Sequence, residues 1–195
     1  MQCSINAKEL NMEWIIPGTA LKWDRDKVDT FEPQLKSMFM LGGVLLSQVT
    51  SLTGLEGHMV QNWVKRGFLS PPENKHYSLN QLCRIININM LKNALPLEKI
   101  CGLLTYINGD LDDESDDIID DSTLYFTFLK LAARAKSIDD EGNWQEALSE
   151  TLKDYSEPYK GAKKRVEEVL KIMVIAYIAS RFKTTAENMV ENLNI

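Results

Sequence analysis

A polar stripe in the first half of the sequence has the chemistry needed to contact nucleic-acid bases. A helix is predicted at residues 57–66. Three- and four-residue spacing places four polar side chains on its outward face: His58, Gln61, Asn62 and Lys65. Glutamine and asparagine amides can bond both polar atoms of an adenine edge, and a lysine ammonium can reach guanine or a phosphate. The stripe is a candidate base-reading surface, although any exposed helix also carries polar side chains outward.

Three further residues next to this stripe are candidates for contacts with a sugar-phosphate backbone. They are Arg66 at the end of the predicted helix, and Lys75 and His76 in the segment "FLSPPENKHYS". Two adjacent prolines make this segment a short loop, which would hold a cation beside the helix, where a phosphate of bound DNA would lie. The alternative interpretation is a surface turn in which the lysine is incidental.

Two short helices joined by a glycine turn would position these groups. The first is predicted to begin with Ser47 as its cap and to end at Gly54. The second would stop at Gly67, because glycine readily adopts the left-handed backbone that closes many helices. The residues predicted to be buried on the second helix are Val60, Trp63 and Val64. This arrangement is typical of a helix-turn-helix motif.

Further helices are predicted along the chain, and no strand is predicted outside the proline loop. Ser78 and Gln81 form a capping box at the start of one helix, and Pro96 and Gly109 flank the next. Beyond an acidic segment, helices are predicted at 122–136, 143–155 and from about 158 to at least 182.

The last of these helices is apolar nearly all round between Val169 and Ala179. Such a helix must be covered on more than one side. Either the other C-terminal helices cover it or a second subunit does, and a homodimer is the interpretation to pursue.

Charge is unevenly distributed along the chain. The formal net charge of -6 counts against a protein that must contact phosphates. However, residues 1–109 carry a net charge of +2 and residues 110–195 carry -8, while residues 41–108 alone carry +3. The acidity therefore belongs to the C-terminal part of the chain, and the predicted motif is mildly basic.

The sequence gives no indication of a metal site, a cofactor or an enzyme. The three cysteines lack Cys-x-x-Cys spacing, and the two histidines have no cysteine nearby. A calcium loop starting at Asp112 would need glycine and glutamate where Asp117 and Thr123 stand. Common nucleotide-binding, hydrolase and metalloprotease motifs are absent from the sequence. We therefore expect no metal, cofactor or catalytic residue, and either a solvated linker or a helix lead-in at 110–121.

A cytoplasmic location is expected. The N-terminal residues lack a basic region followed by an apolar run, so no secretory signal is predicted. The most apolar window, Val169 to Ala179, contains Lys171 and is shorter than the roughly 20 residues that cross a bilayer. The odd number of widely spaced cysteines indicates reduced thiols.

The order of these elements resembles a known family pattern. The segments "NWVKRGFL" and "LPLEKICGLL", with a short loop ending in Tyr-Ser between them, are similar to the MerR-type winged helix-turn-helix domain. The segment "MVQNWVKRGFLSPPENKHYSLNQLCRI", together with "IIPGTALKWDRDKV", resembles more closely an uncharacterised bacterial family, domain-of-unknown-function family eighteen thirty-six. The resemblance covers roughly residues 15–125.

The MerR-type resemblance implies a reading helix at 57–66, a wing at 70–77 and a homodimer formed through long helices after the head. Such proteins commonly have arginine where this sequence has Gln61, and another arginine in the wing where it has His76. Both differences remove a cation from the implied interface and weaken its phosphate contacts.

We therefore expect an all-α-dominated protein with a MerR-like winged helix-turn-helix head, a minimal wing and a C-terminal helical bundle. Its expected parts are residues 1–40 packing on the head, the head at 41–109, the acidic connector at 110–121 and the helical domain at 122–195. The expected function is a transcriptional regulator that binds double-stranded DNA and dimerises or senses an effector through its C-terminal helices. The alternative is a protein-interaction adaptor that keeps the fold without binding DNA. An enzyme with dispersed catalytic groups ranks behind both.

Overall fold

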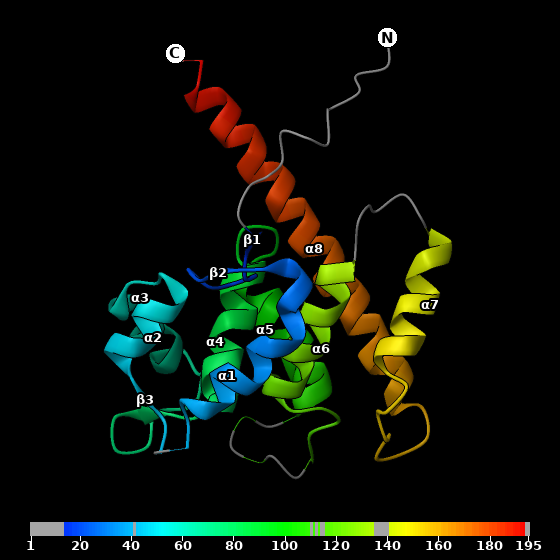
Figure 1. Cartoon of the computed structure of the whole chain (residues 1–195). Helices are drawn as coiled ribbons and strands as arrows, with labels where there is room; N and C mark the ends of the chain where they lie inside the picture. The colour runs from blue at the N-terminus through cyan, green and yellow to red at the C-terminus, as the bar shows by residue number, and fades with distance from the viewer. Residues whose placement is uncertain are drawn as a thin grey trace.

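The computed structural model describes residues 14–40, 42–109, 111, 113, 116–134 and 141–193, and side chains at 134 and 141–145 are not described. Helices dominate this part of the chain, which confirms the all-α-dominated expectation (Figure 1). The first elements are β1 (Trp14–Ile15), β2 (Lys22–Trp23), the 3-10 helix η1 (Arg25–Thr30) and α1 (Phe31–Ser37). They are followed by β3 (Val44–Leu45), α2 (Leu46–Thr53), α3 (Gly57–Lys65) and β4 (His76–Tyr77). The remaining helices are α4 (Leu79–Leu91), α5 (Leu97–Asn108), α6 (Asp121–Arg134), α7 (Glu141–Thr151) and α8 (Ala162–Glu191).

Helix α4 lies at the centre of the fold and packs against α2, α5, α6 and α8. The predicted capping box begins it: the Gln81 backbone N–H donates to the Ser78 hydroxyl at 3.2 Å, and the Ser78 N–H donates to the Gln81 side chain at 2.9 Å. Nine of its side chains are buried, including the charged Arg84. A helix that is buried on nearly all sides needs neighbours on every face, and α4 has them.

The two short helices predicted around Gly54 are present as α2 and α3. Gly54 and Gly67 end the two helices with φ angles of 70° and 71°, in the left-handed region that glycine adopts at least cost. Helix α2 begins at Leu46, earlier than predicted, and the Gln48 side chain rather than Ser47 caps it by accepting from the Leu45 N–H at 2.9 Å. Sequence alone favoured Ser47 because serine is the commoner capping residue.

The prediction of no strand outside the proline loop was wrong. Strands β1 and β2 pair antiparallel, and β3 pairs with β4 across the α2–α3 unit. Each strand has two residues, which is too short for an alternating pattern to show in the sequence. The turn after β1 lies in close contact with α4, because a Cβ added at Gly18 would lie only 2.5 Å from the Ile86 carbonyl oxygen. The N-terminal segment is therefore fitted closely to the central helix.

One hydrophobic cluster runs from Ile16 to Ala176 among the described residues, so the core continues past the expected acidic connector. Helix α8 begins at Ala162, four residues later than predicted, and it continues well past 182. Its C-terminal end, red in Figure 1, extends beyond the other elements. The α2–α3 unit and α7 lie on opposite sides of the central helices (Figure 1). The expected parts at 1–13 and 135–140, and residues 110, 112, 114 and 115 of the connector, lie outside the described residues.

Candidate nucleic-acid interface

The outward face of α3 carries the predicted polar stripe. Val60 and Trp63 are buried against the core, as expected, and Val64 is half-buried. The stripe is exposed along its whole length, at His58, Gln61, Asn62 and Lys65. Because the buried side chains fix the rotation of the helix about its axis, the polar side chains are held facing solvent.

A groove of about 480 Å³ lies between α2, α3 and the loop that follows α3. Gln61 of α3 and Lys75 of the loop both line it, although the sequence separates them widely. The remaining lining residues include Ser47, Pro72 and the buried Tyr77. The fold therefore brings the candidate base-reading helix and the candidate phosphate contact to one concave surface. Ser47, predicted only as a helix cap, is an exposed part of this surface that sequence reasoning missed.

Lys75 stands at the tip of a tight turn. The His76 backbone N–H donates to the Glu73 carbonyl at 2.8 Å, and the two residues between them, Asn74 and Lys75, have φ angles of 49° and 69°. Two successive residues with positive φ are typical of a type I′ hairpin turn. The turn fixes the lysine at the rim of the groove, where its ammonium makes no ion pair with a described residue.

His76 is exposed beside this turn and is the first residue of β4, where it pairs with Leu45 of β3. Its ring Nδ1 lies 2.9 Å from the Asn74 carbonyl oxygen. A neutral ring protonated at Nδ1 would donate to this carbonyl and leave Nε2 as an acceptor, whereas a protonated ring would donate from both nitrogens. The contact with the Asn74 carbonyl holds the His76 ring at the surface beside Lys75.

Arg66 is bonded within the protein. Its Nη2 lies 2.6 Å from the Glu98 carboxylate of α5, and its guanidinium lies over the Phe68 ring, 4.4 Å from the centroid. The pKa of Glu98 is held below its usual range by its own backbone N–H and by Arg66. Arg66 was a candidate for backbone contact, and the ion pair reduces its availability for a phosphate.

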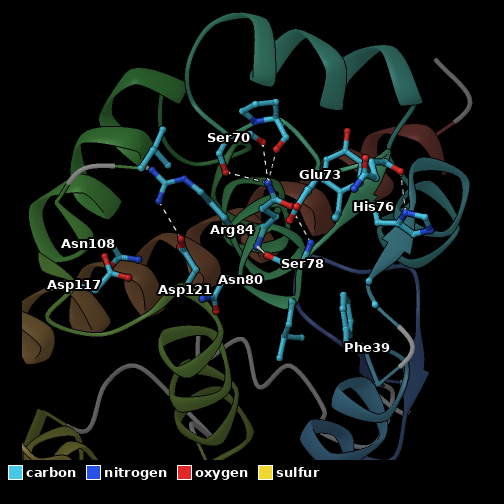
Figure 2. A pocket seen from close by; sticks show the side chains of 18 residues that line it. Phe39, Ser70, Glu73, His76, Ser78, Asn80, Arg84, Asn108, Asp117 and Asp121 are labelled. Atoms are coloured by element: carbon cyan, nitrogen blue, oxygen red, sulfur yellow. Dashed lines mark hydrogen bonds and ion pairs between the residues drawn. The ribbon is translucent and has the colours of Figure 1, made fainter. Parts of the chain in front are cut away.

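Gln81 positions the loop relative to α4. Besides capping α4, its side-chain Nε2 donates to the Pro71 carbonyl at 2.9 Å and to the Ser70 hydroxyl at 3.0 Å. The same nitrogen lies 3.2 Å from the Ser70 carbonyl oxygen. The loop that carries Lys75 therefore begins from a fixed point on the central helix, seen in Figure 2.

A buried ion pair joins α4 to α6. Arg84 donates from Nη1 to Asp121 of α6 at 3.1 Å and from Nε to the Phe68 carbonyl at 2.9 Å, and both charged residues are buried (Figure 2). Burial raises the pKa of Asp121, and Arg84 opposes that effect. The +3 charge expected for 41–108 counted Arg84, so less positive charge reaches the surface than the sequence indicated.

Polar groups around this pair line the floor of a second pocket, of about 670 Å³, between the loop, α4 and α6 (Figure 2). The amide of Asn108 is buried, and neither of its polar atoms makes a hydrogen bond to the protein. Asp121 Oδ1 and Asn87 Oδ1 are also buried without a hydrogen bond. Buried water commonly satisfies such groups. Sequence reasoning missed this cluster, because it joins side chains that lie far apart in the chain.

Within the described residues, no group of histidine, cysteine and acidic side chains has the arrangement of a metal site. Cys83 and Cys101 are buried thiols whose pKa values are raised by burial. Asp112 and Glu114 of the calcium-loop comparison lie outside the described residues. The helices that the structure describes include none with both the length and the apolar character of a bilayer-crossing segment.

Comparison with known proteins supports the closer of the two resemblances. Residues 32–128 match the family described as "Domain of unknown function (DUF1836)", and this range holds every candidate interface residue. The chain is 25% identical over 162 residues to the uncharacterized protein YkrK of Bacillus subtilis (strain 168), over 77% of this chain and 70% of that protein. No solved structure matches the chain.

Proposed function

We propose that this protein is a cytoplasmic transcriptional regulator that binds double-stranded DNA with a MerR-like winged helix-turn-helix head. The observation that carries the proposal is the groove shared by Gln61 and Lys75, between a helix that carries a wholly exposed polar stripe and a tight turn that carries a cation. A helix of this kind fits a major groove of about 12 Å width, with the adjacent turn over the phosphates.

Each side chain has a role in this arrangement. Base contacts come from the α3 stripe, at His58, Gln61, Asn62 and Lys65. Backbone contacts come from Lys75 and His76, and from Arg66 when it leaves Glu98. Because amides rather than arginines dominate the stripe, sequence discrimination should depend on paired hydrogen bonds to adenine more than on charge.

Selection from a random duplex pool tests this proposal. The wild-type protein should enrich a sequence containing an adenine contact, and Gln61→Ala should relax the preference at one base pair at a cost of about 1–3 kcal/mol. The matched control is Gln34→Ala, on the exposed side of α1, which should enrich the same sequence as the wild type. Retention of DNA without enrichment of any sequence would overturn the base-reading role.

A second candidate function is a protein-interaction adaptor that uses the same fold without DNA. The 2.6 Å ion pair between Arg66 and Glu98 favours it, because it removes a cation from the interface. A partner captured by the wild-type protein should then also be captured by the double variant Lys65→Ala/Lys75→Gly. Loss of the partner in that variant would contradict the adaptor.

A further inference from the structure

The pocket of about 670 Å³ between the loop, α4 and α6 is separate from the proposed DNA groove. Gln61 and Lys75 line the groove, whereas a different set of side chains lines this pocket, and the buried Tyr77 is common to both. Sites for small molecules commonly have volumes of about 300–1,000 Å³. The pocket therefore has the size of a small-molecule site, and its lining decides which molecule fits.

Buried polar atoms without a partner lie at the floor of this pocket. Asn108, the last residue of α5, is 5% exposed, and neither its amide nitrogen nor its amide oxygen makes a hydrogen bond to a described residue. Asp121, the first residue of α6, is 8% exposed, and its Oδ1 also lacks a hydrogen bond within the described part of the chain. Because such atoms cost folding free energy, they call for water or a ligand. The floor offers two acceptor atoms and one donor.

The Asn108 amide and the Asp121 carboxylate are close neighbours. Burial raises the pKa of Asp121, and Arg84 opposes that effect, as do the amides of Asn108 and Asn87. Figure 2 shows Asn108 and Asp121 beside Asp117 at one end of the pocket. A single ammonium group, which has three N–H donors, can therefore serve both unpartnered oxygens.

The charge of the lining selects a cation. Carboxylates of Glu73, Asp117 and Asp121 line the pocket, together with one arginine, Arg84, and one histidine. Arg84 is already bonded within the protein, to Asp121 Oδ2 at 3.1 Å and to the Phe68 carbonyl at 2.9 Å. The excess of negative charge attracts a cation and repels an anion such as a phosphate.

Apolar side chains also line the pocket. They include the half-buried Phe39 and Leu79 and the buried Tyr77. Figure 2 shows Phe39 at the opposite end of the pocket from Asn108. A molecule that fills the pocket therefore needs an apolar body as well as a polar, cationic group.

We propose that this pocket binds a small organic amine with a hydroxyl or carbonyl oxygen next to its ammonium group and an apolar body. The ammonium donates to Asp121 Oδ1 and Asn108 Oδ1, and the neighbouring oxygen accepts from the Asn108 amide nitrogen. The apolar body packs against Phe39. Water would satisfy the same polar atoms, but it uses neither the negative charge nor the apolar end of the pocket.

The site does not depend on DNA binding. Its rim is the turn that carries Lys75, because Glu73, Asn74 and His76 also line the pocket. A bound amine should therefore hold this turn, and a consequence for DNA affinity would rest on the proposed function. Binding of the amine is measured without DNA, so failure of the amine site and failure of DNA binding are distinguishable.

Saturation-transfer NMR of the full chain with three matched probes tests the ligand class. Phenylalaninol has the ammonium, the neighbouring hydroxyl and an aromatic body, whereas phenylpropanol lacks the amine and hydrocinnamate has a carboxylate instead. Phenylalaninol should bind at millimolar concentration, and the other two should bind at least about tenfold more weakly, because they lose a charge-assisted hydrogen bond. No binding of phenylalaninol, as expected if the pocket holds only water, would overturn the proposal, and so would equal binding of the three probes.

Two variants locate the site. Asn108→Leu keeps a similar side-chain volume but removes both unpartnered atoms, so it should weaken phenylalaninol binding at least about tenfold. Glu73→Gln changes only an exposed residue of the rim, which keeps the fold intact, and should weaken binding about twofold to fivefold. The matched control Gln34→Ala, on the exposed side of α1, should bind phenylalaninol like the wild type. Unchanged binding by Asn108→Leu or by Glu73→Gln would contradict the proposed site.

Discussion

The Arg66 guanidinium on the end of α3 lies 2.6 Å from the Glu98 carboxylate on α5. One of the cations nearest to the candidate DNA surface is therefore engaged by the protein's own acid. The remaining exposed cations at the proposed interface are Lys65 on α3 and Lys75 on the turn. The first prediction concerns this ion pair, because it holds Arg66 in the free protein and keeps it from a DNA phosphate.

Replacing Glu98 with glutamine should strengthen DNA binding. The substitution removes a negative charge near the interface and frees Arg66, so affinity for duplex DNA at low salt should rise roughly threefold to tenfold. Fluorescence anisotropy with a labelled duplex measures the effect. Glu191→Gln, on the exposed end of α8, removes a charge far from α3 and should leave the affinity unchanged. Weaker binding by Glu98→Gln would contradict the proposed position of the DNA.

Replacing Lys75 with glycine should separate binding from stability. The φ of 69° at Lys75 suits glycine, so the free energy of unfolding in urea should stay within about 1 kcal/mol of the wild type. DNA affinity should fall, and the slope of log affinity against log salt should decrease by about 1. Asn74→Gly changes the same turn but keeps the cation, and it should bind DNA like the wild type. Equal losses in the two variants would show that the turn, not the charge, matters.

Breaking the buried Arg84–Asp121 pair should destabilise the fold strongly. Arg84→Met leaves an unpaired buried carboxylate, and urea denaturation should show a loss of about 3–5 kcal/mol. Arg84→Met/Asp121→Leu should recover much of that loss, because no buried charge remains. If Arg84→Met/Asp121→Leu were no more stable in urea than Arg84→Met, the stability loss would not come from the unpaired carboxylate, which would contradict this explanation.

The same pair sets a dependence on pH. Burial raises the folded-state pKa of Asp121, and Arg84 opposes this effect. The contribution of Asp121 to the free energy of unfolding is therefore most favourable below the pKa of an exposed aspartate. It is lost as pH rises through the folded-state pKa. Loss of Arg84 removes the opposing charge and raises that pKa further. Arg84→Met should therefore become more stable, relative to Arg84→Met/Asp121→Leu, as pH falls from neutral toward mildly acidic values. A constant difference across that range would contradict this sign.

Asp120 caps α6 and should contribute the opposite pH dependence. Its carboxylate accepts from the Thr123 N–H at 2.9 Å and the Ser122 N–H at 3.1 Å. Burial raises its pKa, but hydrogen bonds from Ser122 and Thr123 outweigh that effect and lower it. Asp120→Ala should cost about 1–2 kcal/mol at neutral pH, measured by urea denaturation. The cost should persist above the pKa of an exposed aspartate and decline as pH falls through the lowered folded-state pKa. A cost that increases in acid would contradict the cap.

Local signals made much of the fold predictable. The Ser78–Gln81 capping box and the glycines at 54 and 67 each act through neighbouring residues, so the sequence alone placed them correctly. The pairing of β3 with β4 depends on residues far apart in the chain, and two-residue strands leave no periodic signal. The ion pair of Arg84 with Asp121 was missed for the same reason.

Helix α8 shows a different limit. Exposed apolar residues follow three-and-four spacing in the sequence from Ile172 to Leu193, but the core-facing residues on the first part of the same helix are also apolar. Val169, Met173 and Val174 are buried, and they hide the exposed row in a plain hydropathy pattern. Side-chain exposure in the folded chain separates the two stripes.

The affinity of the wild-type protein for duplex DNA, measured by fluorescence anisotropy as salt is raised, tests the central claim most directly. Binding should be measurable at low salt and should weaken linearly on a log–log scale, and Lys65→Ala/Lys75→Gly should reduce that slope by about 2. No measurable affinity at low salt, where phosphate contacts are strongest, would contradict DNA binding by this surface.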